Sequence, residues 1–236
     1  MTILTLNLHC YAEDHIKDNQ MRIVDKIIEH DVDVACFQEA CQSVDMCYLN
    51  DIQKELKMRG HHYEHVFASS NIAFDTYDEG VAILSRLNIV NTNVTHISKT
   101  QDYHDWKTRK AIHADVLWSN KVIRITSIHF GWTDEKEVFE TQFDTLYKAL
   151  NHDMTQIICG DYNIDDKSDE YRYVTKHVYD LWDQQTKTNA STHGDKRIDY
   201  IMSNQTLSVK KQHVLFCEED SKVSDHCGVL MTLDLK

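Results

Sequence analysis

The hydrophobic and polar positions of the chain form many short strand patterns and three clear helical ones. Apolar residues recur at helical spacing in three segments, which are predicted as helices: residues 21–28, 51–59 and 139–150. Shorter apolar or alternating runs are predicted as strands: residues 2–8, 32–39, 62–68, 80–84, 89–96, 111–118, 121–130, 155–159, 197–203, 207–216 and 227–235. Strands therefore outnumber helices, and the helices appear singly between runs of strands.

These elements predict an α/β protein. Two sheets packed face to face, with helices on the outside, bury the apolar faces of such strands economically. No internal repeat and no Gly/Ser-rich linker divides the 236 residues, and this length suits one sizeable domain. We therefore expect a single domain over residues 1–236.

The charge balance restricts the partners of the protein. Its 25 Lys and Arg residues stand against 38 Asp and Glu residues, which gives a formal charge of −13. Such a balance disfavours tight non-specific binding to nucleic acid or to an anionic membrane, because both need basic surface. A small anionic substrate stays compatible with it when a bound metal supplies local positive charge.

Two features of the sequence bear on the cellular compartment. The chain begins with a strand pattern rather than a basic and apolar leader, and no apolar run approaches about twenty residues. We expect a cytoplasmic protein. Its seven cysteines form no C-x-x-C pair, and an odd count suits free thiols in a reducing compartment. A zinc site built from Cys36, Cys41 and Cys47 is the less favoured alternative.

Polar residues that bind metals or transfer protons stand at, or just after, the ends of several predicted strands. Strand ends hold side chains rigidly at a common edge of a sheet, where catalytic groups must converge. The residues with this placement are Asn7, Glu39, His129, Asp161, Asn163, Asp199, Asp225 and His226.

In this order, and together with Glu79 in Glu-Gly-Val-Ala-Ile-Leu-Ser, these motifs resemble the endonuclease/exonuclease/phosphatase superfamily. That superfamily includes DNase I, exonuclease III-type repair enzymes, neutral sphingomyelinases and inositol polyphosphate 5-phosphatases. The resemblance runs from Asn7 to His226. It implies a DNase I-like, four-layered α/β sandwich of two mostly antiparallel sheets with helices outside. It also implies a site at one edge of the two sheets.

The resemblance implies a magnesium site and an activated water. Glu39 is the prime metal ligand, with Asn7 and Asp225 nearby, and Mn²⁺ is a substitute that such an oxygen-rich site accepts. Asp161 is expected to orient or deprotonate the attacking water. Asn163 is expected to hold that water or a phosphoryl oxygen.

The remaining catalytic candidates are histidines and their partners. His226 is expected to contact the phosphoryl group, with Asp199 fixing and charging its imidazole. His129 is expected to pair with Glu79, as in the DNase I-like branch, and to assist the leaving oxygen. Arg109 is either a phosphate clamp or a solvated residue at a strand entry.

Further motif details resemble the maltose 6'-phosphate phosphatase group. Trp106 and Trp132 would stack on a sugar face or pack in the core, and His9 would line the pocket.

The predicted function is therefore a Mg²⁺-dependent phosphatase that acts on a small phosphorylated metabolite such as a sugar phosphate. A DNase I-like or repair-type nuclease acting on DNA or RNA is the alternative, which the net charge disfavours. A sphingomyelinase-like phosphodiesterase and an inactive binding module are weaker alternatives. The sequence leaves the oligomeric state open.

Overall fold

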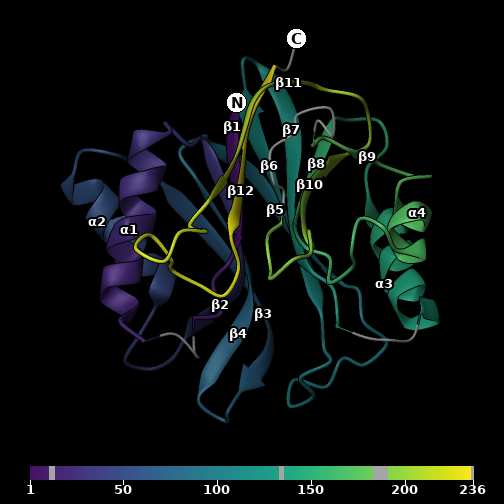
Figure 1. Ribbon diagram of the computed structural model, residues 1–236, viewed down its shortest axis with the longest axis horizontal. Helices are drawn as coiled ribbons and strands as arrows, with labels where there is room; N and C mark the ends of the chain where they lie inside the picture. Colours follow the sequence, from purple (N-terminus) through teal and green to yellow (C-terminus); the bar gives the residue numbers. More distant parts are fainter. Residues whose placement is uncertain (11–13, 133–135, 183–190, 235–236) are drawn as a thin grey trace.

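Two six-stranded sheets stack face to face in the computed structural model of the protein, and pairs of helices flank them on either side (Figure 1). The structure describes residues 1–10, 14–132, 136–182 and 191–234. Within the described residues, no helix is long and apolar enough to cross a membrane.

The first sheet has the strand order β11-β12-β1-β2-β4-β3. In this sheet β1 and β2 run parallel, and the other pairs are antiparallel. Its strands are β1 (Thr2–Asn7), β2 (Val34–Gln42), β3 (Glu64–Ala73), β4 (Tyr77–Ser85), β11 (Ser208–Leu215) and β12 (Gly228–Asp234).

The second sheet has the order β5-β6-β7-β8-β10-β9, and it also contains one parallel pair, β7 and β8. Its strands are β5 (Ile89–His96), β6 (Lys110–Trp118), β7 (Lys121–His129), β8 (Gln156–Asp161), β9 (Tyr179–Asp180) and β10 (Asp199–Ser203). The predicted pair of mostly antiparallel sheets is confirmed.

The two parallel strand pairs, β1 with β2 and β7 with β8, determine where the candidate residues come together. Parallel neighbours need a long crossover, which α1 (Ile16–Glu29) supplies between β1 and β2 and α3 (Lys136–Ala149) supplies between β7 and β8. Parallel strands also bring their carboxyl ends to one edge. Asn7 therefore lies beside Gln38 in the first sheet, and His129 lies beside Asp161 in the second.

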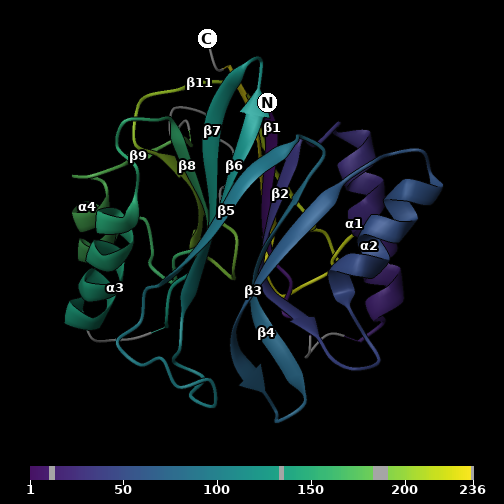
Figure 2. The ribbon, with the colours of Figure 1, turned by 180° about the vertical axis from the view of Figure 1, so that it is seen from behind.

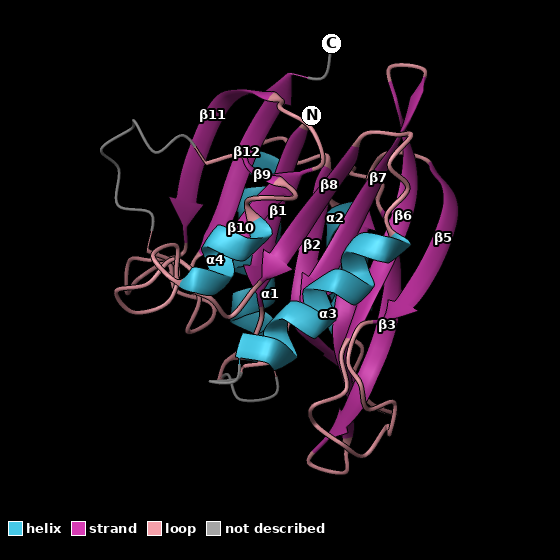
Figure 3. Cartoon of the chain, turned by 90° about the vertical axis from the view of Figure 1, so that its right-hand side faces the viewer, coloured by secondary structure: helices cyan, strands magenta, loops and turns pink. Residues whose placement is uncertain are grey.

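Three apolar cores separate four layers, as the resemblance implied. One core lies between the first sheet and the helices α1 and α2 (Tyr48–Met58). A second lies between the sheets, and a third lies between the second sheet and the helices α3 and α4 (Asp169–Val174). The view from behind and the side view show the two helix pairs on opposite outer faces (Figures 2 and 3).

The helices form where the apolar spacing predicted them. Ile23 and Ile27 of α1 are fully buried against the first sheet, as are Ile52 and Leu56 of α2. In α3, the side chains of Phe139, Phe143 and Leu146 are buried in the third core. The short elements α4 and β9 were not predicted, because six and two residues are too few to display a period.

The expectation of free thiols is wrong for four of the seven cysteines. The structure joins Cys10 to Cys41 and Cys217 to Cys227 as disulfides. Cys36, Cys47 and Cys159 are free. The alternative of a zinc site from Cys36, Cys41 and Cys47 is also wrong, because Cys41 is bonded to Cys10. The fold brings together cysteines whose separations of 31 and 10 residues carry no signal in the sequence.

Candidate active site

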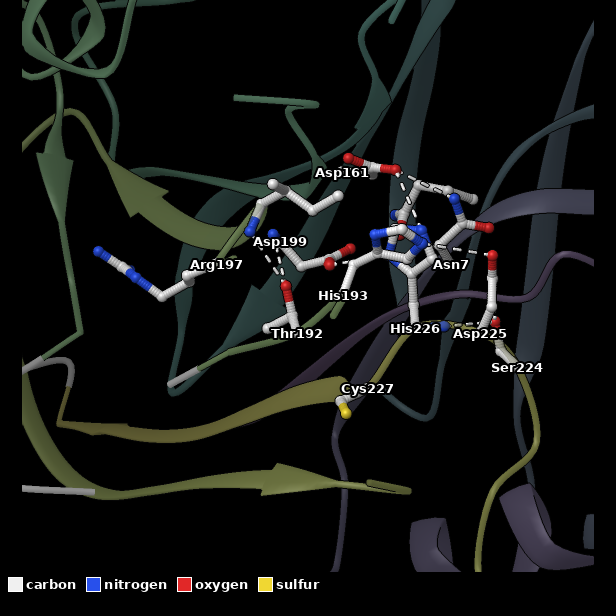
Figure 4. A network of polar contacts seen from close by, with 12 residues as sticks. Asn7, Asp161, Thr192, His193, Arg197, Asp199, Ser224, Asp225, His226 and Cys227 are labelled. Carbon is white, nitrogen blue, oxygen red and sulfur yellow. Dashed lines mark hydrogen bonds and ion pairs between the residues drawn. The ribbon is translucent and has the colours of Figure 1, made fainter. Parts of the chain in front are cut away.

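The carboxyl ends of β1, β7 and β8 meet at one edge of the stacked sheets, beside the start of β10. They present Asn7, His129, Asp161 and Asp199 to a common region. A bond between the two sheets lies close to this region, since the Gln38 amide donates to the Ser127 hydroxyl at 3.1 Å. Figure 4 shows side chains from these distant segments pointing toward one another, with His226 from the loop before β12 among them.

Two further residues of the site, Glu39 and Asn163, have unusual backbone conformations. Glu39 has a φ of 48° at a point where the register between β2 and β4 shifts, which marks a β-bulge. Asn163 has a φ of 54° just after β8. Bulges and left-handed residues re-aim side chains and collect at functional sites, where the surrounding structure maintains the strain. Glu39 and Asn163 are thus placed at a local conformational cost.

The Asn7 amide holds two carboxylates in the site. Its Nδ2 donates to Glu39 Oε1 at 3.0 Å and to Asp161 Oδ2 at 3.1 Å. Its Oδ1 accepts the backbone N–H of His9 at 3.1 Å, so the amide orientation is fixed from both ends. Asn7 is fully buried. The predicted proximity of Asn7 and Glu39 therefore takes the form of a hydrogen bond.

Asp161 is a buried carboxylate with several partners. Its Oδ1 accepts the backbone N–H of Asn163 at 2.8 Å. Burial and the neighbouring Asp199 raise the pKa of Asp161, His226 lowers it, and the net result is a pKa of about 7. A carboxyl with a pKa near neutrality accepts a proton readily, which suits a general base.

Asn163 orients its amide within the same cluster. Its Nδ2 donates to the Phe130 carbonyl at 2.9 Å and lies 3.2 Å from Nε2 of His129. That nitrogen of His129 is also 3.6 Å from Asp161 Oδ2. Burial holds the pKa of His129 well below its usual value, and Arg109 and His226 add to this effect. His129 is therefore a neutral imidazole in this site.

His226 and Asp199 form a hydrogen-bonded pair. His226 Nδ1 lies 2.9 Å from Asp199 Oδ2, and both side chains are buried. Burial by itself would lower the pKa of His226, but the charge and hydrogen bond of Asp199, with Asp161 and Asp225, raise it to about 10. The imidazole is therefore cationic at neutral pH, and its Nε2 lies 3.8 Å from Asp161 Oδ2.

Hydrogen bonds of Thr192 connect the segments that carry Asp199 and His226. The sequence did not predict a role for Thr192. The Thr192 hydroxyl accepts the N–H groups of Ile198 and Asp199 at 3.0 and 3.1 Å. The Thr192 carbonyl accepts the N–H of Cys227, which follows His226, at 2.7 Å. Figure 4 shows Thr192 between the two segments.

Glu79 has a different partner from the one expected. It hydrogen-bonds Asn71, whereas the contacts of His129 with described residues lead to Asn163, Asp161 and Glu39. Burial and the nearby charge of Glu39 together raise the pKa of Glu79 to about 7. Glu79 and His129 nevertheless line one cavity.

The donor set suits a hard divalent cation. Glu39 Oε2 and Asp199 Oδ1 are buried and have no hydrogen-bond partner among the described residues. Asp161 and Asp199 also lie together with His226 within 4.8 Å of one another, although the cationic imidazole of His226 has no lone pair for a metal. Oxygen ligands of this kind, with room for waters, are what Mg²⁺ requires.

Asp225 lies at the exposed side of this cluster. Its carboxylate is 3.5 Å from His9 Nδ1 and 3.5 Å from His193 Nε2. The backbone of His9 in turn bonds Asn7. The predicted ligand Asp225 is thus connected to Asn7 and Glu39 through His9, with no direct bond to either among the described contacts.

A cleft of about 470 Å³ opens over these residues. Its floor includes Glu39, Asp161 and His226, and its walls include both predicted tryptophans, Trp106 and Trp132. Their rings are exposed rather than packed in the core. The alternative of core packing is therefore excluded for these two residues.

Arg109 is buried rather than a solvated residue at a strand entry. Its Nη1 donates to the Trp106 and Thr108 carbonyls at 2.6 and 3.2 Å. Its Nε is buried and has no partner among the described residues. A guanidinium with such a donor left over beside a cleft suits recognition of an anion.

Two further residues of the cleft wall were missed by the sequence analysis. His193 packs its ring 4.7 Å from that of His226, and Lys196 lines the same cleft. The backbones of these two residues bond each other across a short turn. The only signal in the sequence is their position three to six residues before Asp199.

Two stacked mixed sheets with carboxylates, amides and histidines gathered at one edge define a metal-dependent phosphoric ester hydrolase of the DNase I-like fold. The model of the Endonuclease/Exonuclease/phosphatase family matches residues 4–226, and the chain belongs to this family. A search of curated proteins found no match.

Solved structures share the fold at low sequence identity. An endonuclease/exonuclease/phosphatase family protein from Leptotrichia buccalis superposes with a TM-score of 0.87 at 23% identity, over 100% of both chains. TDP2 from D. rerio, complexed with a single-strand DNA product, gives 0.77 at 17% identity, over 100% of this chain and 99% of that one. The mannosyl-6-phosphatase Bt3783 from Bacteroides thetaiotaomicron gives 0.71 at 17% identity, over 100% of both.

Proposed function

We propose that this chain is a single catalytic domain that removes phosphate from a small phosphorylated metabolite such as a sugar phosphate, using Mg²⁺. The observation that carries the proposal is the Asn7 amide, which fixes the Glu39 carboxylate and the Asp161 carboxylate within one hydrogen-bonded unit. One carboxylate has a free buried oxygen for a cation, and the other has a pKa suited to accepting a proton.

Glu39 and Asn7 are the residues that would hold the cation, with Asp225 as an outer ligand. When bound, Mg²⁺ supplies positive charge that neutralises the phosphoryl oxygens. Mn²⁺ is expected to substitute, since both cations accept oxygen ligands.

The residues of the chain then position and deprotonate water. Asp161 accepts the proton of the attacking water through Oδ2, while its Oδ1 stays bonded to the Asn163 backbone. Cationic His226 donates from Nε2 to a phosphoryl oxygen, because its Nδ1 is bonded to Asp199. Arg109 lines the same cleft, and its guanidinium offers a second group for the phosphoryl oxygens.

Two observations support a small substrate rather than nucleic acid. The net charge of −13 opposes binding to a polyanion. The cleft has exposed indole rings at its walls, which suit the flat faces of a sugar. The solved structures do not discriminate, because a mannosyl-6-phosphatase and DNA-bound TDP2 share the fold at the same 17% identity.

The test is a panel of substrates with Mg²⁺: hexose phosphates, p-nitrophenyl phosphate, bis-p-nitrophenyl phosphate and plasmid DNA. We expect inorganic phosphate from the hexose phosphates and intact plasmid. The matched control is Asp161→Asn, which keeps the size of the side chain and removes the base. Plasmid nicking that Asp161→Asn abolishes, without phosphate release from any monoester, would establish the nuclease instead.

A further inference from the structure

A second cavity of about 220 Å³ adjoins the catalytic cleft beside the β3–β4 hairpin. We propose that this cavity, the leaving-group pocket, binds the hydroxylated ring of the sugar whose phosphate is removed. Its lining includes Asn71, Ile72, Phe74, Glu79 and Trp106. The inference rests on the proposed function and assigns the part of the substrate that leaves.

The position of the pocket relative to Asp161 carries the assignment. The pocket and the cleft share Glu39, Trp106, Arg109 and His129, so the phosphoryl group at this junction borders both. Asp161 lines only the cleft, and Glu79 lines only the pocket. In phosphoryl transfer the attacking and leaving oxygens lie roughly in line on opposite sides of phosphorus. Water activated by Asp161 therefore directs the leaving group into the pocket.

His129 stands at the boundary where the leaving oxygen would be. Its imidazole is buried and lines both cavities. It is held by Asn163, which bonds the Phe130 carbonyl.

The walls combine apolar rings with buried polar groups. Phe74 and Trp106 expose 75% and 56% of their surfaces. Asn71 and Glu79 are buried and bonded to each other, so an amide and a carboxyl lie on the inner wall. A sugar ring presents C–H faces to aromatic rings and hydroxyls to amides and carboxyls. A site of this mixed kind fixes orientation through a few polar groups on a largely apolar lining.

Hydrogen bonds connect the segments that form the walls of the pocket. The loop that carries Trp106 is bonded to the hairpin through Ile72 N–H, which donates to the Tyr103 carbonyl at 3.0 Å. The Trp106 carbonyl accepts from Arg109 at 2.6 Å and from Asn71 at 3.5 Å. The hairpin itself extends past the neighbouring strands at the bottom of Figure 1. Walls from the two sheets thus enclose the pocket.

The size of the pocket suits a single ring. Pockets for drug-sized ligands measure roughly 300–1,000 Å³, and the 220 Å³ here is smaller. The amide of Asn71 and the carboxyl of Glu79 on the inner wall can accept hydrogen bonds from, and donate them to, the hydroxyls of such a ring.

The test compares kcat/KM for a hexose phosphate, glycerol phosphate and a nucleoside monophosphate in Trp106→Ala and Asn71→Ala. We expect kcat/KM for the hexose phosphate to fall by about 10- to 100-fold, as for other lost pocket contacts. Glycerol phosphate should lose much less, because it has no ring. Trp106→Phe should recover most of the loss. The dephosphorylated sugar should inhibit the wild type competitively and the two alanine variants more weakly.

The control is Tyr179→Ala, which removes another half-exposed aromatic ring, on the edge strand β9. Equal losses for all three phosphates in both alanine variants would overturn the leaving-group pocket and leave the phosphatase function established. Faster turnover of the nucleoside monophosphate than of the hexose phosphate would overturn the sugar assignment. Absence of phosphate release from every monoester by the wild type would overturn the proposed function and this pocket with it.

Discussion

His226 Nδ1 and Asp199 Oδ2 lie 2.9 Å apart in a buried part of the site, so the carboxylate determines the charge of the imidazole. The pKa of His226 rises to about 10 although burial alone would lower it, because Asp199 and the other acidic neighbours favour the charged form. A group with this pKa stays cationic over the whole physiological pH range.

Asp199→Asn should therefore change the pH dependence of the enzyme. Without the carboxylate charge, the pKa of His226 falls and the neutral imidazole dominates near pH 7. We expect kcat/KM to fall by about 100-fold or more at neutral pH, with a smaller loss under acidic conditions. A pH–rate profile of wild type and variant measures this. A uniform loss at all pH values would mean that Asp199 acts only on the structure.

Asp161→Asn should lose activity and gain stability. Loss of a general base is worth about 10²- to 10⁴-fold in rate. The pKa of Asp161 is raised from 3.8 to about 7 by burial, so between these values the folded state binds more protons than the unfolded state. The stability of the cation-free protein consequently falls as pH rises through this window, and the asparagine removes the penalty.

The gain from Asp161→Asn should be roughly 1–3 kcal/mol at pH 8. Urea unfolding in the presence of EDTA, at pH 5 and pH 8, measures it. A variant less stable than the wild type at pH 8 would show that hydrogen bonds to Asp161 outweigh its burial. Activity close to that of the wild type would remove Asp161 from the role of base.

His113 should make the protein sensitive to acid. Its imidazole is buried between the hydroxyls of Thr95 and Thr126, at 3.0 and 2.9 Å. Burial lowers its pKa from 6.5 to about 4, and Arg124 adds to this effect. Between these values the unfolded state binds more protons, so stability is complete above pH 6.5 and is lost as pH falls toward 4.

The contribution of His113 to this loss is about 3 kcal/mol. His113→Gln keeps hydrogen-bonding capacity and cannot titrate, so its free energy of unfolding should depend less on pH in that window. Denaturant unfolding from pH 7 to pH 4 provides the measurement. Parallel pH curves for wild type and variant would contradict the prediction.

Glu39→Gln should weaken cation binding. The mutation removes the charge of the carboxylate whose Oε2 is buried without a partner. At a concentration 100 times the Kd, a ligand stabilises the folded state by about 2.7 kcal/mol. We expect Mg²⁺ to raise the Tm of the wild type and to raise that of the variant much less. EDTA should abolish activity, and Mg²⁺ or Mn²⁺ should restore it. An equal rise in Tm for both proteins would place the cation elsewhere.

The sequence predicted the fold, because the fold depends on long patterns, and the structure gathers the central candidate residues in one region. Asn7 and Asp161 end strands whose apolar runs are visible in the sequence, whereas Glu39 lies at a bulge inside β2 and Asp199 begins β10, two placements that the sequence did not indicate. Parallel pairs in each sheet then bring those ends to one edge. The order of the motifs along the chain carried the resemblance to the superfamily, and the expected roles of these residues came from that resemblance.

Individual contacts between side chains were not predictable from such patterns. The partner of Glu79 is Asn71, an unremarkable residue in the adjacent strand, rather than His129. His193 reaches His226 only because Thr192 joins two segments that are far apart in the chain. The disulfide partners Cys10 and Cys41 likewise follow from the parallel placement of β1 and β2. Such pairings depend on tertiary structure and leave no period or motif.

The most direct test of the account is the fate of the oxygen atom of water. A hexose phosphate is incubated with the enzyme and Mg²⁺ in water enriched in ¹⁸O, and both products are analysed by mass spectrometry. Attack of water on phosphorus predicts one ¹⁸O atom in each inorganic phosphate and none in the sugar hydroxyl that carried the phosphate, with no label incorporated by Asp161→Asn. Label in the sugar hydroxyl, or unlabelled phosphate, would contradict the proposed reaction.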